Sequence, residues 1–175
     1  MVEDIVRTLG YATLGSRLKR IGEKLQSQTQ ELAISLAGED LPTPYNPVLA
    51  ALDLHGPMSI GDLAKSLGQS QPGITRMIKK MKSAGLVEPR PDQTDKRVST
   101  IELTTDGSKL VEKLKAQHWP AVTLAVEDAC RELHGSFLEQ LSQLEQTLSE
   151  LALADRHPPP PFPDWDTMRK SEESE

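Results

Sequence analysis

The apolar residues of the first 56 positions follow a helical period. Over residues 3–36 they recur every three or four positions, which predicts one long amphipathic helix. A proline-rich loop at 41–47 follows, and 46–56 predicts a short buried helix. Asn46 is its expected N-cap, Pro47 its first helical residue and Gly56 its end. The apolar positions of the long helix are Ile5, Leu9, Ala12, Gly15, Leu18, Ile21, Leu25 and Leu32.

Two further short helices are expected over 59–68 and 69–85. Ser59 followed by Asp62 has the spacing of a capping box at the start of the first, and Ser70 is the expected N-cap of the second. Glycines at 68 and 85 end the two helices. A pair of short helices joined by a four-residue turn has the spacing of a helix-turn-helix.

The period then changes from helical to alternating. Residues 86–90 and 98–103 predict two strands, and the polar segment 91–97 between them predicts a hairpin tip. Thr104 or Thr105 is expected to cap a helix that runs to about residue 117, is kinked at Trp119-Pro120 and resumes through Leu133. Gly107, early in this helix, is expected to allow close packing.

The C-terminal pattern predicts a helix with an apolar stripe and then an extended tail. His134-Gly135 breaks the chain, and Ser136 with Glu139 forms a capping box that opens a helix to about Leu153. A stripe of two heptads is too short for a free coiled coil but long enough to pack on another helix. With Ile5 and Leu9 of the first helix, the expected dimerisation residues are Phe137, Leu141, Leu144, Leu148 and Leu151.

This pattern predicts a mostly α-helical protein with a small β-wing. The expected regions are an N-terminal dimerisation helix at 1–40, a winged helix-turn-helix at 41–104, C-terminal dimerisation helices at 105–154 and a Pro-rich acidic tail at 155–175.

Charge is distributed unevenly along the chain. The whole chain of 175 residues has a net charge of −6, yet residues 70–100 hold seven Lys and Arg against three acidic residues. This segment therefore carries +4 on a body of −10, which suits local binding of a polyanion. One cysteine, no secretory signal and no apolar stretch long enough to span a bilayer predict a cytoplasmic protein away from membranes.

The segment DKRVSTIELTTDG, residues 95–107, resembles the wing signature of the MarR family of bacterial transcription regulators. That signature is Asp-x-Arg followed by a strand that ends in Leu-Thr, then x-x-Gly. The preceding residues 59–90 are similar to the DNA-binding helices and first wing strand of the same family, and the resemblance covers roughly residues 5–153. It implies a homodimeric repressor, and two-fold symmetry with one reading helix per subunit then predicts a pseudo-palindromic operator in double-stranded DNA.

The N-terminal part of the second helix is expected to enter the major groove. There Gln71 suits adenine, while Arg76 suits guanine or a phosphate. Lys79 and Lys80, further along the helix, are expected to meet phosphates. At the wing, Arg97 suits the minor groove, and Asp95 suits a bidentate pair that orients it. The expected DNA-binding residues are Ser70, Gln71, Pro72, Gly73, Thr75, Arg76, Lys79, Lys80, Arg90, Asp95, Lys96 and Arg97.

Other interpretations remain open at this point. The charged helix and wing would be a solvated surface if the protein were a winged-helix module that docks another protein. Cys130 and His134, one helical turn apart beside Glu127, would suit a metal or thiol switch. We expect neither a metal nor a cofactor, and no enzyme, since the chain has no GxSxG, P-loop, HExxH or paired-carboxylate pattern.

Control by a small molecule is a further expectation, which rests on the family resemblance and on topology. We expect a pocket near the junction of the first helix, the 46–56 helix and the 104–118 helix. The first candidates for its ligand are phenolic acids and other small aromatic carboxylates.

Overall fold

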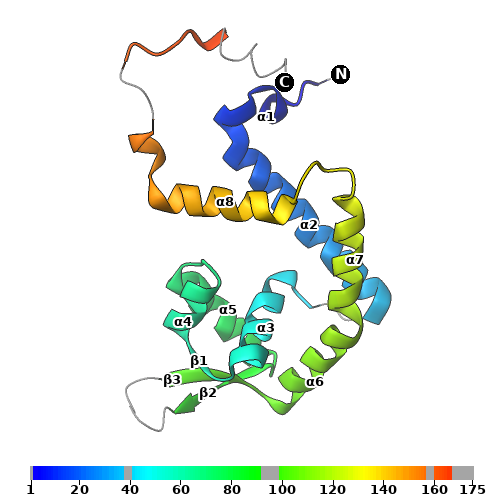
Figure 1. Cartoon of the computed structure of the whole chain (residues 1–175). Helices are drawn as coiled ribbons and strands as arrows, with labels where there is room; N and C mark the ends of the chain where they lie inside the picture. Colours follow the sequence, from blue (N-terminus) through cyan, green and yellow to red (C-terminus); the bar gives the residue numbers. More distant parts are fainter. Residues whose placement is uncertain (1, 38–40, 92–98, 157–159, 167–175) are drawn as a thin grey trace. The chain divides into compact units, whose positions relative to one another are not determined.

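The computed structural model describes residues 2–37, 41–91, 99–156 and 160–166 (Figure 1). It divides into two compact units, one of residues 24–125 and one of residues 1–23 with 126–175. The mostly α-helical fold with a small β-sheet confirms the expected fold class.

The N-terminal segment is not one long helix, so that prediction is wrong. It forms α1 (Ile5–Thr8), a 3₁₀ turn η1 (Gly10–Thr13) and α2 (Leu14–Ala37). Gly10 has a φ of 51°, a conformation that favours glycine over residues with a Cβ. The Thr13 hydroxyl donates to the Val6 carbonyl at 2.6 Å, which closes the turn back onto α1.

The core of the 24–125 unit is aliphatic and centres on α3 (Asn46–His55), α4 (Ile60–Ser66) and α5 (Gln71–Ser83). The short helix α3 is buried, as its apolar pattern predicts. Its predicted N-cap is wrong, because Tyr45 occupies that position after the 3₁₀ turn η2 (Thr43–Tyr45). The most enclosed side chains of this core are Val48, Leu49, Leu63, Ile74, Met81, Val87 and Val111.

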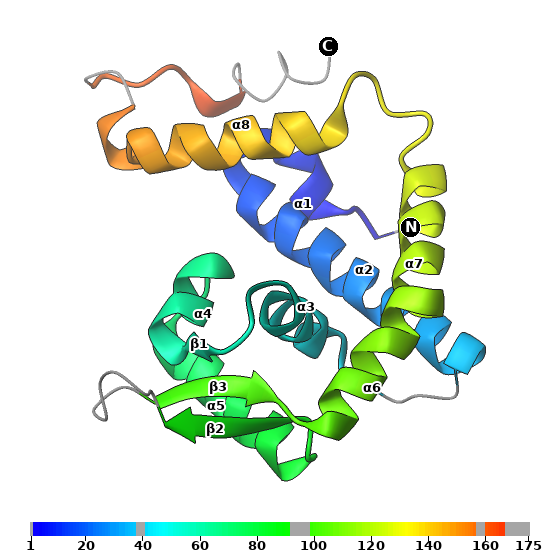
Figure 2. The same cartoon turned by 60° about the horizontal axis from the view of Figure 1, so that its bottom comes forward.

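A small antiparallel sheet completes this unit (Figure 2). The wing strands are β2 (Val87–Pro91) and β3 (Ser99–Leu103), within one residue of the predicted bounds. A third strand, β1 (Met58–Ser59), was not predicted and pairs with the other side of β3. From the register, Val87 opposes Leu103 and Pro89 opposes Ile101. Of these, Val87 and Ile101 are buried in the core.

The helix after the wing is continuous but changes its winding. It comprises α6 (Thr105–Lys113), a π-helical turn η3 (Leu114–His118) and α7 (Trp119–Ala129). The widened turn ends two residues before Pro120, whose nitrogen has no hydrogen for an intrahelical bond. The helix ends at Ala129 rather than at Leu133, and Gly135 with a φ of 74° precedes α8 (Phe137–Glu150).

Candidate nucleic-acid interface

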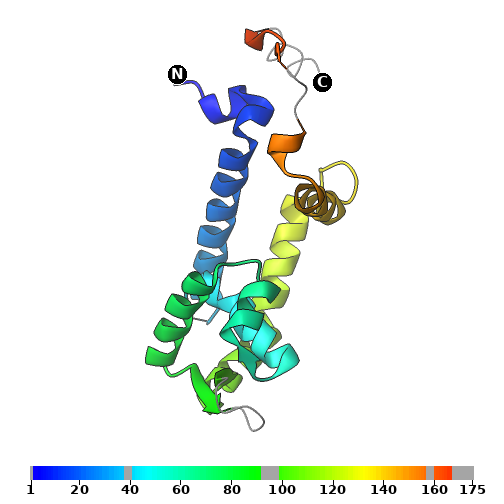
Figure 3. The same cartoon turned by 90° about the vertical axis from the view of Figure 1, so that its left-hand side faces the viewer.

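Local capping builds the helix-turn-helix from α4 and α5. Ser59 caps α4 by accepting from the Asp62 amide at 3.0 Å. Ser70 caps α5 by accepting from the Gly73 amide at 3.3 Å. Between the helices Gly68 has a φ of 60°, which lets the chain turn sharply. The short turn therefore holds α5 in a defined position against α4, and α5 leads directly into the wing strands (Figure 3).

The two faces of α5 differ in character. Ile74, Ile78 and Met81 are buried in the core. The opposite face is exposed and basic, and a shallow surface depression lies over its first turns. Because the apolar face packs in the core, the polar face of α5 points to solvent. The predicted residues exposed on α5 are Gln71, Pro72, Thr75, Arg76, Lys79 and Lys80, while Gly73 is half-buried.

Two of these side chains already have internal neighbours. The Thr75 hydroxyl donates to the Gln71 carbonyl at 2.8 Å, so its hydrogen is committed to the helix backbone. The Gln71 amide nitrogen lies 3.2 Å from the point where a Cβ on Gly61 would stand. Because Gly61 has no side chain, the side-chain amide of Gln71 can lie beside the first turn of α4.

The wing carries a feature that the sequence reasoning missed. Arg90 forms an ion pair with Glu102 of the neighbouring strand, at 3.0 Å between Nη1 and Oε2. Glu88 stands directly opposite Glu102 in the register. The Arg90 guanidinium thus offsets a like-charge pair on this face of the sheet. The three other predicted wing residues, Asp95, Lys96 and Arg97, lie outside the described residues.

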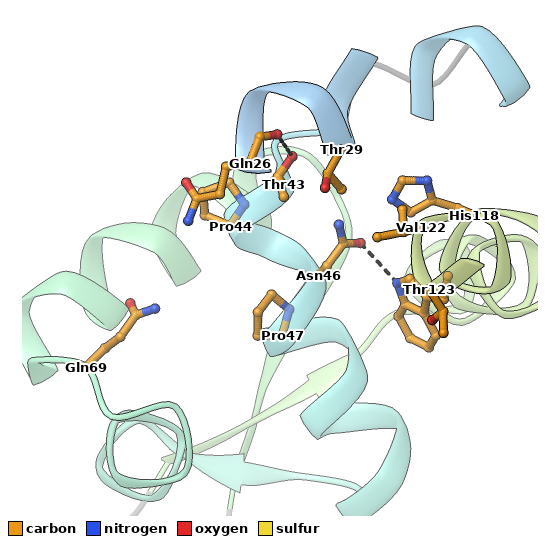
Figure 4. Close-up of a pocket in the computed structure, with 11 residues that line it drawn as sticks. Gln26, Thr29, Thr43, Pro44, Asn46, Pro47, Gln69, His118, Val122 and Thr123 are labelled. Atoms are coloured by element: carbon orange, nitrogen blue, oxygen red, sulfur yellow. Dashed lines mark hydrogen bonds between the residues drawn. The ribbon is translucent and has the colours of Figure 1, made fainter. Parts of the chain in front are cut away.

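A cavity of about 440 Å³ lies where α2, α3 and the η3–α7 junction meet, close to the predicted site (Figure 4). Its wall includes Thr29 of α2, Asn46 and Pro47 at the start of α3, and His118 and Trp119. The Trp119 indole nitrogen donates to the Asn46 side-chain oxygen at 3.4 Å, which holds the indole ring at the cavity wall. Asn46 therefore positions Trp119 and does not cap α3.

His118 is the buried polar residue of this wall. Only 3% of its surface is exposed, and its Nδ1 atom is enclosed without a hydrogen-bond partner. Burial lowers the pKa of His118, because the charged imidazolium loses its hydration there. The ring is therefore neutral at pH 7. In the sequence, a single His before a Trp-Pro pair gave no signal that this side chain would be buried in a cavity wall.

The alternative switch at Cys130 does not have the expected geometry. Since α7 ends at Ala129, Cys130 and His134 do not share a helical face, and the prediction of their placement is wrong. Among the described residues, no three His, Cys, Asp or Glu side chains are grouped to hold a metal. None of the described helices is both long and apolar enough to cross a membrane.

Comparison with known proteins finds sequence similarity to transcription regulators. Residues 39–98 match the sequence model described as the MarR family. The chain is 25% identical over 109 residues to the uncharacterized HTH-type transcriptional regulator YfiV of Bacillus subtilis, covering 62% of this chain and 68% of YfiV. It is 35% identical over 66 residues to the HTH-type transcriptional repressor NicR of Pseudomonas putida, covering 38% of this chain and 42% of NicR.

A similar fold occurs in the crystal structure of MepR from S. aureus in complex with DNA. The TM-score is 0.61 at 21% identity, and the match covers 80% of this chain and 95% of MepR. The match shows that this chain shares the fold of MepR.

Proposed function

We propose that this chain is a member of the MarR family of DNA-binding transcriptional regulators, since residues 39–98 match the model of that family, and that it is a homodimeric repressor whose affinity for its operator is tuned by a small molecule. The observation that carries the proposal is α5, a helix with a buried apolar face and an exposed basic face, followed at once by a wing. The relative NicR is a repressor by name, which supports the sign of regulation.

In this proposal the first two turns of α5 read base edges in the major groove. Pro72 and Gly73 keep the helix surface low, so the backbone can approach the bases closely. Arg76 suits guanine or a phosphate, and Gln71 suits adenine. Because the Thr75 hydroxyl hydrogen is committed to the helix, its methyl group is the part suited to the C5-methyl of thymine.

Backbone contacts would orient the protein on the duplex. Lys79 and Lys80 are exposed further along α5, where they suit phosphates. We also propose, on the family resemblance, that Arg97 of the wing enters the minor groove and that Asp95 orients its guanidinium. Arg90 is a weaker candidate, because leaving Glu102 for a phosphate would break its ion pair.

Dimerisation would cover the apolar surface of the unit that holds α1 and α8. Ile5, Phe137, Leu148 and Leu151 are exposed there, although each is a large apolar residue. Leu9, Leu141 and Leu144 are half-buried. Apolar residues repeated along one helix in this way support contact with a second copy of the chain, and a two-fold dimer presents one α5 per half-site.

The cavity beside His118 supports control by a ligand. Its wall includes α3, whose buried face belongs to the same core as α5. A ligand shifts the equilibrium between the DNA-bound and free forms of the protein only by its difference in affinity for those two forms. A tenfold loss of operator affinity requires about 1.4 kcal/mol of coupling, and reciprocity then requires tenfold tighter ligand binding to the free dimer.

Selection of bound duplexes from a random pool tests the DNA-binding part of this proposal. We expect an inverted repeat with half-site centres about 10 bp apart. Arg76→Ala should relax preference at one base pair in each half-site by about 1–3 kcal/mol, whereas Lys79→Ala should weaken binding to all sequences about equally. Selected duplexes without an inverted repeat, or equal effects of the two variants on specificity, would contradict it.

A further inference from the structure

The cavity beside His118 has a mostly apolar wall with neutral polar groups set into it. Thr29, Thr43, Asn46, Gln69 and Thr123 supply neutral hydrogen-bonding groups, and Pro44, Pro47, Val122 and Trp119 supply apolar surface. Among the described residues that line the cavity, none is Lys, Arg, Asp or Glu. An anionic ligand would therefore find no fixed cation in the described wall.

His118 is the single titratable side chain of that described wall. Its ring projects from η3 toward Thr29 and Asn46 (Figure 4). The other described residues that line the cavity, from α2, from the Thr43–Pro47 segment, from the turn at Gln69 and from α7, are all uncharged. The nearby Lys115 on the same turn is paired with Asp53 at 3.1 Å and with Glu112 at 3.3 Å.

A buried nitrogen without a partner is unusual in a folded protein, because its hydration is lost and nothing replaces it. The Nδ1 atom of His118 is such an atom. A neutral imidazole has one donor nitrogen and one acceptor nitrogen, so Nδ1 donates to a ligand group in one tautomer and accepts from it in the other. The cavity volume of about 440 Å³ has room for an aromatic ring with polar substituents.

We infer that the cavity takes an uncharged, hydroxyl- or amide-bearing aromatic molecule that hydrogen-bonds to His118 as neutral imidazole, and that aromatic carboxylates are the poorer ligands. This inference rests on the proposed effector role of the cavity. It narrows the chemical class, and it reverses the preference for aromatic acids that the family resemblance and topology suggested. Trp119, fixed by Asn46, provides the flat surface for the ring.

Phenol and benzoate are the probes, since both carry one aromatic ring and differ in charge at pH 7. Calorimetric titration of the full chain at about pH 7.5 should show phenol binding at least about tenfold more tightly than benzoate, because burying a carboxylate without a fixed cation is costly. On acidification to about pH 5.5, phenol binding should stay constant or weaken, because phenol stays uncharged over this range. Benzoate that equals or exceeds phenol at the higher pH, or an absence of phenol binding at millimolar level, overturns the inference.

Variants assign any binding to this cavity. His118→Leu should lower phenol affinity by at least about tenfold, and His118→Gln, which restores a hydrogen-bonding group, should recover most of it. The matched control is His55→Leu, at an exposed histidine at the end of α3, which should leave affinity unchanged. If circular dichroism shows that His118→Leu does not fold, the ratio of phenol affinity to benzoate affinity in His118→Gln still tests the inference. A His118→Gln chain that prefers benzoate would overturn the inference.

Operator affinity with and without phenol separates this inference from the function on which it rests. His118-dependent phenol binding together with unchanged operator affinity would support the ligand class and refute the effector role. If phenol lowers operator affinity but His118 substitution does not change phenol binding, the effector role is supported and the proposed contact with His118 is refuted.

Discussion

Gly107 at the start of α6 gives the sharpest test of how the wing is joined to the rest of the unit. A Cβ at this position would stand 2.0 Å from the Leu86 carbonyl oxygen and 3.0 Å from its carbonyl carbon. An ordinary carbon–oxygen contact is about 3.3 Å, so Gly107→Ala requires a displacement of about 1.3 Å. The obstacle is backbone, which cannot rotate away as the end of a side chain can.

Hydrogen bonds hold that carbonyl in place. The Leu86 oxygen accepts from the Thr104 amide at 3.1 Å, and the Leu86 amide donates to Met81 at 3.0 Å. The Thr104 hydroxyl donates to the Gly85 carbonyl at 2.6 Å and accepts from the Gly107 amide at 3.0 Å. Moving α6 away from Leu86 therefore breaks its N-cap and strains the end of β3 together.

The expected loss is large for a single methyl group. Alanine favours a helix over glycine by about 0.5–1 kcal/mol, whereas forcing an atom into packed structure costs about 1–3 kcal/mol or more. With a backbone obstacle we expect a net loss of about 3 kcal/mol in the free energy of unfolding, at the upper end of that range. This corresponds to a fall in Tm of roughly 6–12 °C for a chain of this size.

Thermal and urea unfolding followed by circular dichroism measure this effect. All chains must be compared at one protein concentration, since an oligomer is stabilised by mass action. The matched control is Gly22→Ala in the middle of α2, where a Cβ meets no heavy atom within 4 Å. It should gain about 0.5–1 kcal/mol. If Gly107→Ala is as stable as the parent chain, the close approach of α6 to Leu86 is refuted.

Three further outcomes are expected. Arg97→Ala should weaken operator binding strongly and Asp95→Ala less. The two effects should be non-additive, because the two side chains act as a unit. An unchanged affinity and an unchanged salt dependence for Arg97→Ala would refute the minor-groove role. Removal of residues 136–175 should abolish the dimer in sedimentation, because the Phe137–Leu151 stripe is lost; a truncated chain that sediments as a dimer would contradict this. The lowered pKa of His118 means that the unfolded chain binds its proton more readily, so stability should fall as pH falls below about 6.5; His118→Gln should reduce this slope, and an unchanged slope would show that other groups cause it.

The helices α4 and α5 and the wing strands could be predicted because their signals are local. Ser59, Ser70, Thr104 and Ser136 each accept a hydrogen bond from an amide three residues later. Such a bond depends on a few consecutive residues, so the sequence alone can indicate it. The same holds for the alternating pattern of β3 and for the buried and exposed faces of α5.

The wrong predictions share a different cause. Asn46 and Pro47 have the form of a helix start, but Trp119, 73 positions later, uses the Asn46 oxygen, and η2 moves the cap to Tyr45. The strand β1 has two residues, which is too short to carry a period, and it exists because β3 pairs with it. The first helix was expected to be unbroken, since the pattern of apolar residues continues through the turn at Gly10.

Periodicity, capping residues and the clustered basic charge by themselves determined the helix-turn-helix, the wing strands and the exposed basic face of α5. The cavity, the enclosed nitrogen of His118, the Arg90–Glu102 pair and the contact of Gly107 with Leu86 were decided by the tertiary structure alone. Each joins residues from different elements, at distances set by how the whole core packs. A local pattern can state which side of a helix is apolar, but it holds no information on which atoms of another element that side will meet.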